Sequence, residues 1–455
     1  MSPHDSPLAA PAIDVTVEVP VVGADASVEE VARLMTDMNV TSAVVQGESI
    51  GIVTDRDLRK RVLADGRAPA TPVGDVMTAP AVTVTAQSTV GDVVAIMLEA
   101  GFQHVPVLDE QTVLGVVDAR RALATIDPTP LRAGLRLRQA ESRDQVAEVM
   151  EDVPEGARRL LTTGMSAVGT LRAISAFSDA VTRRAIELAG DPPAEVTWMA
   201  LGSQGRREQS LESDQDHCLI VWDGDPEAAR VWAEDVVGTL AAAGFPRCGG
   251  GTMSSNQTWC NTPQGWNRWI AERTARTEQK AVLEAATAMD ARPVVGRDNE
   301  VFSRLRRSAA ASAPFMSRLA AAATHFKVPL SVFGHISRRF DIKEGVLGPI
   351  AIIARVMGLA AGSDAEDTLG RLSDAEADGE VSAHLGEVLR QGFEVAQRVR
   401  LEDQIEAWQE GRAFGNEMSH DRLTSWEEAL LEEVAKAIKD AQGALEAKYQ
   451  TGYVR

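Results

Sequence analysis

Two segments of the chain repeat each other, and this repeat constrains the fold more than any other feature. Residues 28–45 read VEEVARLMTDMNVTSAVV and residues 90–107 read VGDVVAIMLEAGFQHVPV, and the two align without gaps. Each is followed by a similar strand and helix start, GIVTDRDLR at residue 51 and GVVDARRAL at residue 115. A period of about 62 to 64 residues indicates a tandem duplication of one small structural unit.

The pattern inside each copy predicts a small α/β module. In the first copy apolar residues recur at helical spacing, as at Val28, Val31, Leu34 and Met35. A β-branched run follows and predicts strands. We expect a flexible tail and two modules, at residues 1–13, 14–69 and 70–126.

Residues 14–126 resemble a pair of CBS domains (cystathionine-β-synthase repeats), and the linking VGDVMT at residues 73–78 is part of the resemblance. In that family paired repeats form clefts that bind adenosine nucleotides, and a G-h-x-T-x-x-D element offers its Thr and Asp to the ribose and phosphates. The resemblance implies AMP, ADP or ATP as a regulatory ligand. It also implies a homodimer, because CBS pairs commonly associate.

The binding element is intact only in the first copy, where it comprises Gly51, Ile52, Thr54 and Asp57. The second copy has Asp118 and Arg121 in place of the Thr and the Asp, so the first cleft is the better candidate. A carboxylate in the first turn of a helix can accept from ribose hydroxyls, and the helix N-terminus favours phosphate. The alternative is that Asp57 only caps the helix, a role that Asp55 could also fill.

The rest of the chain predicts three further regions. Residues 127–190 show helical periodicity and are expected to form a helical linker that ends at the Asp-Pro-Pro of residues 191–193. Strands and helices alternate over residues 191–300, and Asp225 with Pro226 predicts a helix start there. Residues 301–455 are almost wholly helical, and Thr424 with Glu427 predicts the capping box of a final helix. The expected fold class is therefore α/β plus all-α.

Composition excludes several classes of protein. A formal net charge of -20 without a compensating basic block makes nucleic acid an unexpected partner, since its binding relies on clustered Lys and Arg. The cysteines, Cys218, Cys248 and Cys260, lack the spacing of a disulfide framework or a zinc site. The apolar stretch at residues 345–362 is broken by Pro349 and Arg355, which predicts a buried helix and no membrane span. With a polar N-terminus unlike a signal peptide, a cytoplasmic protein is expected.

The segment LGSQGRREQSLESDQDHCLIVW, residues 201–222, carries the chemistry. Asp214 and Asp216 precede an apolar strand, and residues two apart in a strand point to the same face. Two parallel carboxylates repel each other unless a cation lies between them, and hard oxygen ligands suit Mg²⁺. Upstream, Gly202 and Ser203 end a short apolar strand, and their backbone and hydroxyl could cradle a phosphate. This is no Walker loop, because no Lys-Ser or Lys-Thr follows the glycines.

A strand, Gly-Ser, ten residues and then Asp-x-Asp on a second strand resembles the DNA polymerase-β-like nucleotidyltransferases. More narrowly, GSQGRREQSLESDQDHCLI resembles nucleotidyltransferases found behind CBS pairs in bacteria, relatives of the uridylyltransferase that modifies the PII protein. With the helical substrate-binding domain that follows in that family, the resemblance covers nearly the whole chain. It implies a polymerase-β-like α/β domain at residues 191–300 and a substrate-binding domain at residues 301–455.

The resemblance also implies a third carboxylate that completes the metal site. Asp290, in ATAMDARPVVG, is the candidate because the family has an Asp-x-Arg-Pro-Val segment here; Glu284 and Asp298 are alternatives. Nucleotide-binding roles are expected for Arg206, Arg292 and Lys343. For each an alternative stays open: Arg206 could pair with Glu208, Arg292 with an aspartate, and Lys343, like Arg355, could serve the helical domain alone.

Other residues near the motif are not expected to act in catalysis. The glycines of CGGGTMSSNQTWC, residues 248–260, permit either a close ligand or a simple turn. Three tryptophans are expected in the core and not as base-stacking residues: Trp259, Trp266 and Trp269. His217 points away from the aspartates if the strand is regular, so it is not expected to be a base.

These features predict a magnesium-dependent nucleotidyltransferase. The attacking group would be an acceptor hydroxyl, possibly that of a protein such as a PII-like regulator, and an adenosine nucleotide at the CBS pair would control the activity. A catalytically silent nucleotide sensor with the same fold is the alternative. Extension of nucleic-acid 3′ ends is a third hypothesis, which the acidic chain disfavours.

Overall fold

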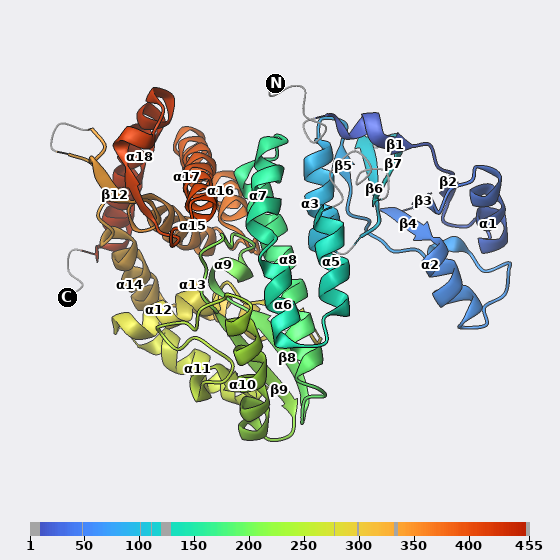
Figure 1. The fold of residues 1–455 in the computed structure, drawn as a ribbon, viewed down its shortest axis with the longest axis horizontal. Coiled ribbons are helices and arrows are strands. Elements are labelled where there is room, and N and C mark those ends of the chain that lie inside the picture. The colour runs from blue at the N-terminus through green and yellow to red at the C-terminus, as the bar shows by residue number, and fades with distance from the viewer. Residues whose placement is uncertain are drawn as a thin grey trace. The chain divides into compact units, whose positions relative to one another are not determined.

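The computed structural model describes residues 10–47, 49–100, 102–110, 112–119, 129–276, 278–297, 300–331 and 335–451. The chain divides into two compact units. One comprises Met1–Leu131 and Arg159–Met165, and the other Arg132–Arg158 and Ser166–Arg455. The chain mixes helices and strands throughout these two units, and its C-terminal part is helical (Figure 1).

The first unit contains one sheet for each copy of the repeat. The first copy has the strand order β2 (Val21–Gly23), β3 (Ser42–Gln46) and β4 (Ile50–Thr54), with helix α1 (Val28–Asp37). The second copy has the order β1 (Thr16–Val17), β7 (Thr112–Asp118), β6 (His104–Asp109) and β5 (Val84–Thr85), with helix α3 (Val90–Ala100). In each copy a parallel strand pair is followed by an antiparallel pair. The predicted duplication of an α/β module is confirmed.

Short helical segments complete this unit: η2 (Ala12–Val15), α2 (Asp55–Asp57), the π-helix η3 (Leu58–Leu63) and η4 (Val73–Asp75). The predicted helical spacing is observed in α1, where Val28, Val31 and Met35 are buried against the strands. Of the expected flexible tail, residues 1–9 lie outside the described residues, while Ala12 is buried.

A mixed sheet organises the second unit. Its strand order is β10 (Cys260–Asn261), β9 (His217–Asp223), β8 (Glu195–Ala200) and β11 (Arg292–Val295). Strand β8 pairs antiparallel with both β9 and β11, and β9 pairs parallel with β10. The C-terminal end of β8 therefore lies beside the N-terminal end of β9, which brings together the segments that carry Gly202 and Asp216.

Alternation along the central strands divides the interior into two cores. Trp198 and Leu219 face a core built with α5 (Thr129–Gln139), α6 (Arg143–Met150), α8 (Ala167–Leu188) and α10 (Pro226–Ala242). Met199 and Ile220 face a larger core built with α11 (Pro263–Ala275), α12 (Gln279–Ala288) and the C-terminal helices. Each buried side chain of this size contributes about 1.5 to 3 kcal/mol. Part of the expected linker, residues 127–190, thus contributes α6 and α8 to the second unit, while residues 127 and 128 lie outside the described residues.

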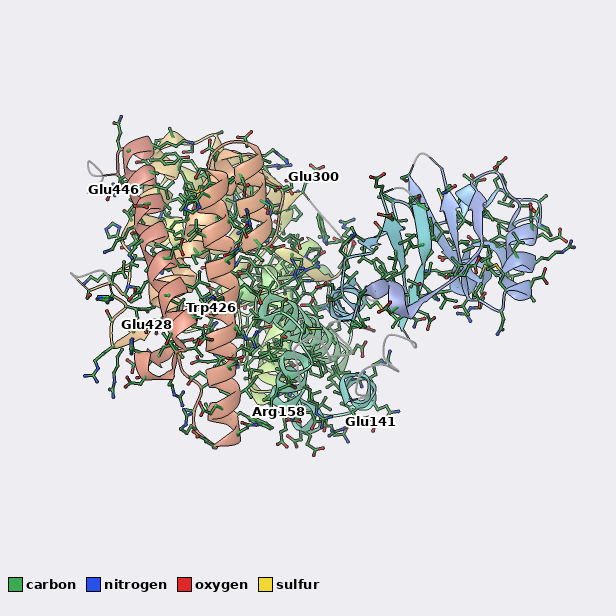
Figure 2. The ribbon with its side chains drawn as sticks, turned by 90° about the horizontal axis from the view of Figure 1, so that it is seen from above. Glu141, Arg158, Glu300, Trp426, Glu428 and Glu446 are labelled. Atoms are coloured by element: carbon green, nitrogen blue, oxygen red, sulfur yellow. The ribbon has the colours of Figure 1, made fainter. Side chains whose placement is uncertain are left out.

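The C-terminal part is built of helices α13 (Val301–Ala310), α14 (Ala313–Thr324), α15 (Gly348–Ala360), α16 (Thr368–Ala377), α17 (Ala383–Gln409) and α18 (Ser425–Tyr449). Shorter elements join them: β12 (Arg339–Asp341), the π-helix η6 (Lys343–Leu347), β13 (Glu417–Ser419) and η7 (His420–Arg422). Helices α17 and α18 pack together, with Trp426 and Glu446 near opposite ends of α18 (Figure 2). A short 3-10 helix, η5 (Gln257–Trp259), precedes β10.

Local sequence signals match these elements where they can be checked. Asp225 caps α10, Pro226 is its first residue, and Gly244 follows its end at φ 90°. Thr424 and Glu427 form the predicted capping box of α18. Helix α15 is buried along nearly its whole length, as expected for residues 345–362. Within the described ranges, no helix is both long enough and apolar enough to cross a membrane.

Candidate functional site

The two aspartates lie directly before β9, in an extended segment. Gln215 forms a parallel bridge with Arg247, and its N–H donates to the carbonyl of Pro246 at 2.9 Å. Because side chains alternate along an extended chain, Asp214 and Asp216 lie on one face and Gln215 on the other. Gln215 is buried, whereas Asp214 is exposed. The two carboxylates thus lie on the outer face of the segment. The backbone N–H of Gln215 holds the segment against the chain at Pro246.

Gly202 fits closely against one of these carboxylates. The N–H of Leu201 donates to the carbonyl of Asp216 at 2.9 Å, which ties the end of β8 to the start of β9. Gly202 follows with φ 54°, and a Cβ at this position would lie 2.6 Å from Oδ2 of Asp216. Both the backbone conformation and the space therefore require glycine here. The short helix α9 (Gly202–Gly205), which includes Ser203, continues the turn.

The carboxyl of Asp216 is largely buried beside a second carboxyl. Burial and the neighbouring charge of Asp214 raise its pKa to about 6, against the lowering effects of a hydrogen bond from Cys248 and of the charges of Arg206 and Lys343. A like-charged pair that repels in this way favours a bound cation. The charge of Lys343, at the start of η6, acts on Asp216 and is thus placed near the expected phosphate site.

Cys248 joins the two aspartates. One ligand atom of each of Asp214, Asp216 and Cys248 lies within 4.8 Å of the other two. Two carboxylates and a thiol are a donor set for a divalent cation. Because Gly202 has no side chain, the carboxylate of Asp216 can occupy its position beside the turn. The residues present therefore fit a cation at this point. Sequence spacing did not indicate Cys248, because the bridge between Gln215 and Arg247 that positions it is not a local feature.

Asp290, the expected third metal ligand, is not among the ligand atoms that converge here. Its carboxylate is buried and accepts from Arg206 at 2.6 Å, Arg355 at 2.5 Å and Arg371 at 2.8 Å. Burial would raise its pKa, but these three guanidinium charges hold the pKa well below its usual range. Its oxygens are thus occupied by arginines. As for the alternatives, Glu284 pairs with Arg273, and Asp298 lies outside the described residues.

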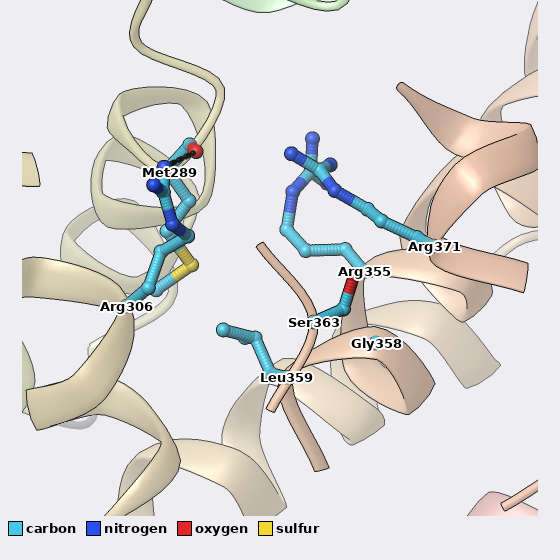
Figure 3. A pocket seen from close by; sticks show the side chains of 7 residues that line it. All are labelled: Met289, Arg306, Arg355, Gly358, Leu359, Ser363 and Arg371. Atoms are coloured by element: carbon cyan, nitrogen blue, oxygen red, sulfur yellow. Dashed lines mark hydrogen bonds between the residues drawn. The ribbon is translucent and has the colours of Figure 1, made fainter. Parts of the chain in front are cut away.

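Two of the three arginines that bind Asp290 border a small cavity. Figure 3 shows Arg355 and Arg371 with their guanidinium groups close together on one side and Arg306 on the other. Arg306 donates to the carbonyl of Met289, and the cavity, of about 10 Å³, has room for roughly one water. Arg355 therefore ties helix α15 to the buried Asp290, a structural role of the kind left open by the sequence.

Arg292 forms an ion pair with an aspartate, one of the two roles that the sequence left open. Its guanidinium is buried and forms a bidentate ion pair with the carboxylate of Asp179 in α8, with nitrogen–oxygen distances of 2.8 and 2.9 Å. It also donates to the carbonyls of Gln204 and Gly205. Arg292 therefore holds the backbone of the glycine turn through the carbonyls of Gln204 and Gly205, and its guanidinium is occupied by these contacts and by Asp179. Pairing with an aspartate was the alternative, but Asp179 was not among the aspartates considered.

Arg206 and Glu208 fasten the loop between the turn and the aspartates. The Nε of Arg206 donates to Glu208 at 2.7 Å, the alternative that the sequence left open, while another nitrogen binds Asp290. Glu208 also accepts from the backbone N–H of Thr368 at 2.7 Å. The loop is thereby tied to the helical part of the unit.

The remaining expectations near the motif agree with the structure. His217 is buried, and burial lowers its pKa to about 3. Its ring accepts from the N–H of Ser254 and bonds Gln215, so it is not oriented with the aspartates. The glycines after Cys248 form a turn, with Gly251 at φ 73°. The tryptophans pack on one another in the core, as expected: Trp259, Trp266 and Trp269.

In the CBS pair, the expected ligand residues bond to each other. Thr54 caps α2, donating to Asp57 at 2.6 Å, while the carboxylate of Asp57 also accepts from the N–H of Thr54 at 3.0 Å. Gly51 and Ile52 lie on β4 directly before them. The helix-capping alternative for Asp57 is therefore observed.

An open cavity of about 230 Å³ lies between the two copies, and residues 39–42 of the first copy help to line it. His104 and Asp118 line it, with their side chains 3.3 Å apart, and Thr41 bonds His104 at 2.8 Å. Arg121 lies outside the described residues.

Family models match the chain in three places. A CBS domain model matches residues 12–64 and 73–127. The model described as "Putative nucleotidyltransferase DUF294" matches residues 151–280, and "Putative nucleotidyltransferase substrate binding domain" matches residues 313–449.

The similar proteins named below each match about a quarter of the chain. The CBS domain-containing protein YhcV of Bacillus subtilis is 32% identical over 104 residues, which are 22% of this chain and 74% of that protein. CBSCBSPB2 of Arabidopsis thaliana, also CBS domain-containing, is 31% identical over 134 residues, 27% of this chain and 25% of that protein. A solved signal-transduction protein with CBS domains from Burkholderia ambifaria is 27% identical, covers 26% of this chain and 90% of that chain, and has a TM-score of 0.24. The chain therefore belongs to the CBS domain-containing proteins, and the regions behind its CBS pair match the two DUF294 models.

Proposed function

We propose that this protein is a metal-dependent nucleotidyltransferase, which transfers NMP from an NTP to an acceptor hydroxyl. The observation that best supports the proposal is the convergence of Asp214 and Asp216 on one face beside the Gly202 turn. Burial and the charge of Asp214 raise the pKa of Asp216, and a cation between the two carboxylates would relieve their repulsion. The match to the DUF294 model supports the same class of reaction.

In this mechanism the protein positions two substrates and balances their charges. Asp214 and Asp216 would hold a divalent cation such as Mg²⁺, which supplies Lewis-acid stabilisation of the phosphate charge. The turn at Gly202 and Ser203 and the charge of Lys343 are suited to binding the triphosphate. The acceptor oxygen bonds to the α-phosphorus, the bond from that phosphorus to the β-bridging oxygen breaks, and pyrophosphate leaves while the hydroxyl proton passes to water.

The acceptor and the regulator follow from the domain arrangement. The match to a substrate-binding domain over residues 313–449 supports presentation of the acceptor by the helical part. By its resemblance to the PII uridylyltransferase, the acceptor would be a protein tyrosine or another hydroxyl. An adenosine nucleotide at the CBS pair would shift an equilibrium between active and inactive arrangements, in a homodimer formed through the CBS pairs.

The test is a transfer assay. The full chain is incubated with each of four α-labelled NTPs, Mg²⁺ or Mn²⁺, and cell extract, and the labelled product is resolved beside Asp214→Asn and the control Asp235→Asn. The expected result is label transfer by the wild type and the control, with loss in Asp214→Asn. Transfer that survives Asp214→Asn excludes the metal mechanism.

A second candidate function is a nucleotide sensor without turnover. It is favoured by one observation: Asp290 is neutralised by three arginines, so the metal-ligand group contains two carboxylates and not three. Calorimetry separates the two functions. Magnesium-dependent NTP binding without pyrophosphate release over hours, in the presence of extract, supports the sensor and contradicts the transferase.

A further inference from the structure

The position of Cys248 follows from strand geometry. Arg247 is the bridge partner of Gln215, so their side chains share one face of the extended pair. Alternation then places Cys248 on the opposite face, with Asp214 and Asp216. The ligand atoms of Cys248, Asp214 and Asp216 accordingly lie within 4.8 Å of one another. The bridge between Gln215 and Arg247 therefore places Cys248 close to the aspartates.

The distances suit one shared cation. Two donors that each lie about 2.0 to 2.3 Å from an ion are at most about 4.5 Å apart. The three ligand atoms already lie within 4.8 Å of one another, so a small closure completes the site. Cys248 is partly exposed and accessible to an ion from solvent, whereas Cys218 and Cys260 are buried. The Sγ of Cys260 donates to the carbonyl of Pro226, away from this group.

We propose that Cys248 is the third protein ligand of the cation held by Asp214 and Asp216, and that its sulfur shifts the site from Mg²⁺ toward softer divalent ions. Carboxylates suit Mg²⁺ and Mn²⁺, whereas thiolate sulfur favours Zn²⁺ and other soft ions. Cys248 thereby takes the place that Asp290 was expected to fill. The inference rests on the proposed function for the presence of a cation, and it adds a ligand and a metal preference to that site.

The test uses Co²⁺ as a spectroscopic probe on the full chain. Sulfur bound to Co²⁺ gives a near-ultraviolet charge-transfer band that oxygen ligands do not give. We expect this band in the wild type and in Cys260→Ser, which retains a hydroxyl donor toward Pro226. Cys248→Ser should lose the band and still bind Co²⁺, with weaker affinity. A wild type that binds Co²⁺ without the band, or a band that persists in Cys248→Ser, overturns the proposal.

Metal preference gives an independent readout. By calorimetry, the ratio of Cd²⁺ to Mg²⁺ affinity should fall at least about tenfold in Cys248→Ser, since even outer-shell partners of a metal site contribute that much. An unchanged ratio contradicts sulfur ligation. As a check that needs no variant, bound Cd²⁺ should slow alkylation of Cys248 in the wild type, and Mg²⁺ should slow it less. Equal rates with and without saturating Cd²⁺ also contradict the proposal.

These results are distinguishable from the fate of the transferase itself. A charge-transfer band without NMP transfer for any NTP supports the Cys248 ligand and counts against the enzymatic function. Transfer that depends on Asp214, without the band, supports the enzyme and removes Cys248 from the metal.

Discussion

The α-carbon of Gly202 faces the carboxylate of Asp216 so closely that a methyl group on it would lie 2.6 Å from Oδ2. This contact joins the glycine turn and the metal-ligand group into one structural element. The turn at the end of β8 therefore fixes the orientation of a carboxylate at the start of β9.

Gly202→Ala should displace the carboxylate of Asp216 and weaken Mn²⁺ binding at least about tenfold. The matched control is Gly190→Ala, because Gly190 also has positive φ, at 76°, but has nothing within 4 Å of an added Cβ. Both variants incur about 1 to 2 kcal/mol of left-handed backbone strain. Calorimetry should thus show a loss of affinity in Gly202→Ala alone, and equal affinities would contradict the role of this contact.

Asp290→Asn should destabilise the protein by about 3 to 5 kcal/mol, since it removes the anion from the buried Arg355 and Arg371 and leaves Arg206 with Glu208 alone. The control Glu402→Gln removes an exposed partner of Arg398 and should change the free energy of unfolding by no more than about 0.5 kcal/mol. Urea denaturation at neutral pH measures both. Because the folded-state pKa of Asp290 is depressed, its contribution is present above pH 4 and declines as pH falls below that value. A neutral effect of Asp290→Asn would contradict the network.

Asp216→Asn should stabilise the metal-free protein at pH 7, by at most about 3 kcal/mol. The folded-state pKa of Asp216, about 6, exceeds the ordinary value of 3.8 for an aspartic acid side chain. The folded state therefore binds the proton more tightly, and the stability of the wild type falls as pH rises from 4 to 6. The advantage of the variant should grow over this range and level off above it, and saturating Mn²⁺ should reverse it. Parallel pH profiles for both proteins would exclude the shift.

Asp179 and Arg292 should behave as one unit. Each single alanine substitution leaves a buried charge unpaired and should cost about 3 to 5 kcal/mol. The double variant should cost less than the sum, with a coupling energy of about 0.5 to 3 kcal/mol in a double-mutant cycle. Additive effects would show that the pair does not support the glycine turn cooperatively.

AMP binding discriminates between the two clefts of the CBS pair. Asp57→Ala should abolish the capping box and weaken AMP binding, as the intact element in the first copy predicts. His104→Ala alters the cavity that lies between the two copies and should leave that affinity unchanged. Isothermal titration of the two variants checks this, and loss of AMP binding only in His104→Ala would place the ligand in that cavity and not at the intact element.

The sequence predicts local features of this protein well and long-range ones poorly. The repeat, the capping box of α18 and the position of the aspartates before β9 each depend on residues that are close together in the sequence. The CBS family model and the observed elements confirm the predicted fold class. The partners of Asp290 come from helices 65 and 81 residues further along, so no local pattern could indicate them. The same holds for Asp179, which lies 113 residues before Arg292, and for Cys248, which is placed by a bridge between distant segments.

The central claim is that Asp214 and Asp216 bind a divalent cation that activates an NTP. Titration of Mn²⁺, followed by the electron paramagnetic resonance of the free ion, tests it most directly in the wild type and in Asp214→Asn/Asp216→Asn, with and without NTP. The account predicts that the wild type removes Mn²⁺ from solution, more tightly with NTP, and that the double variant does not. Equal binding by the two proteins would contradict it.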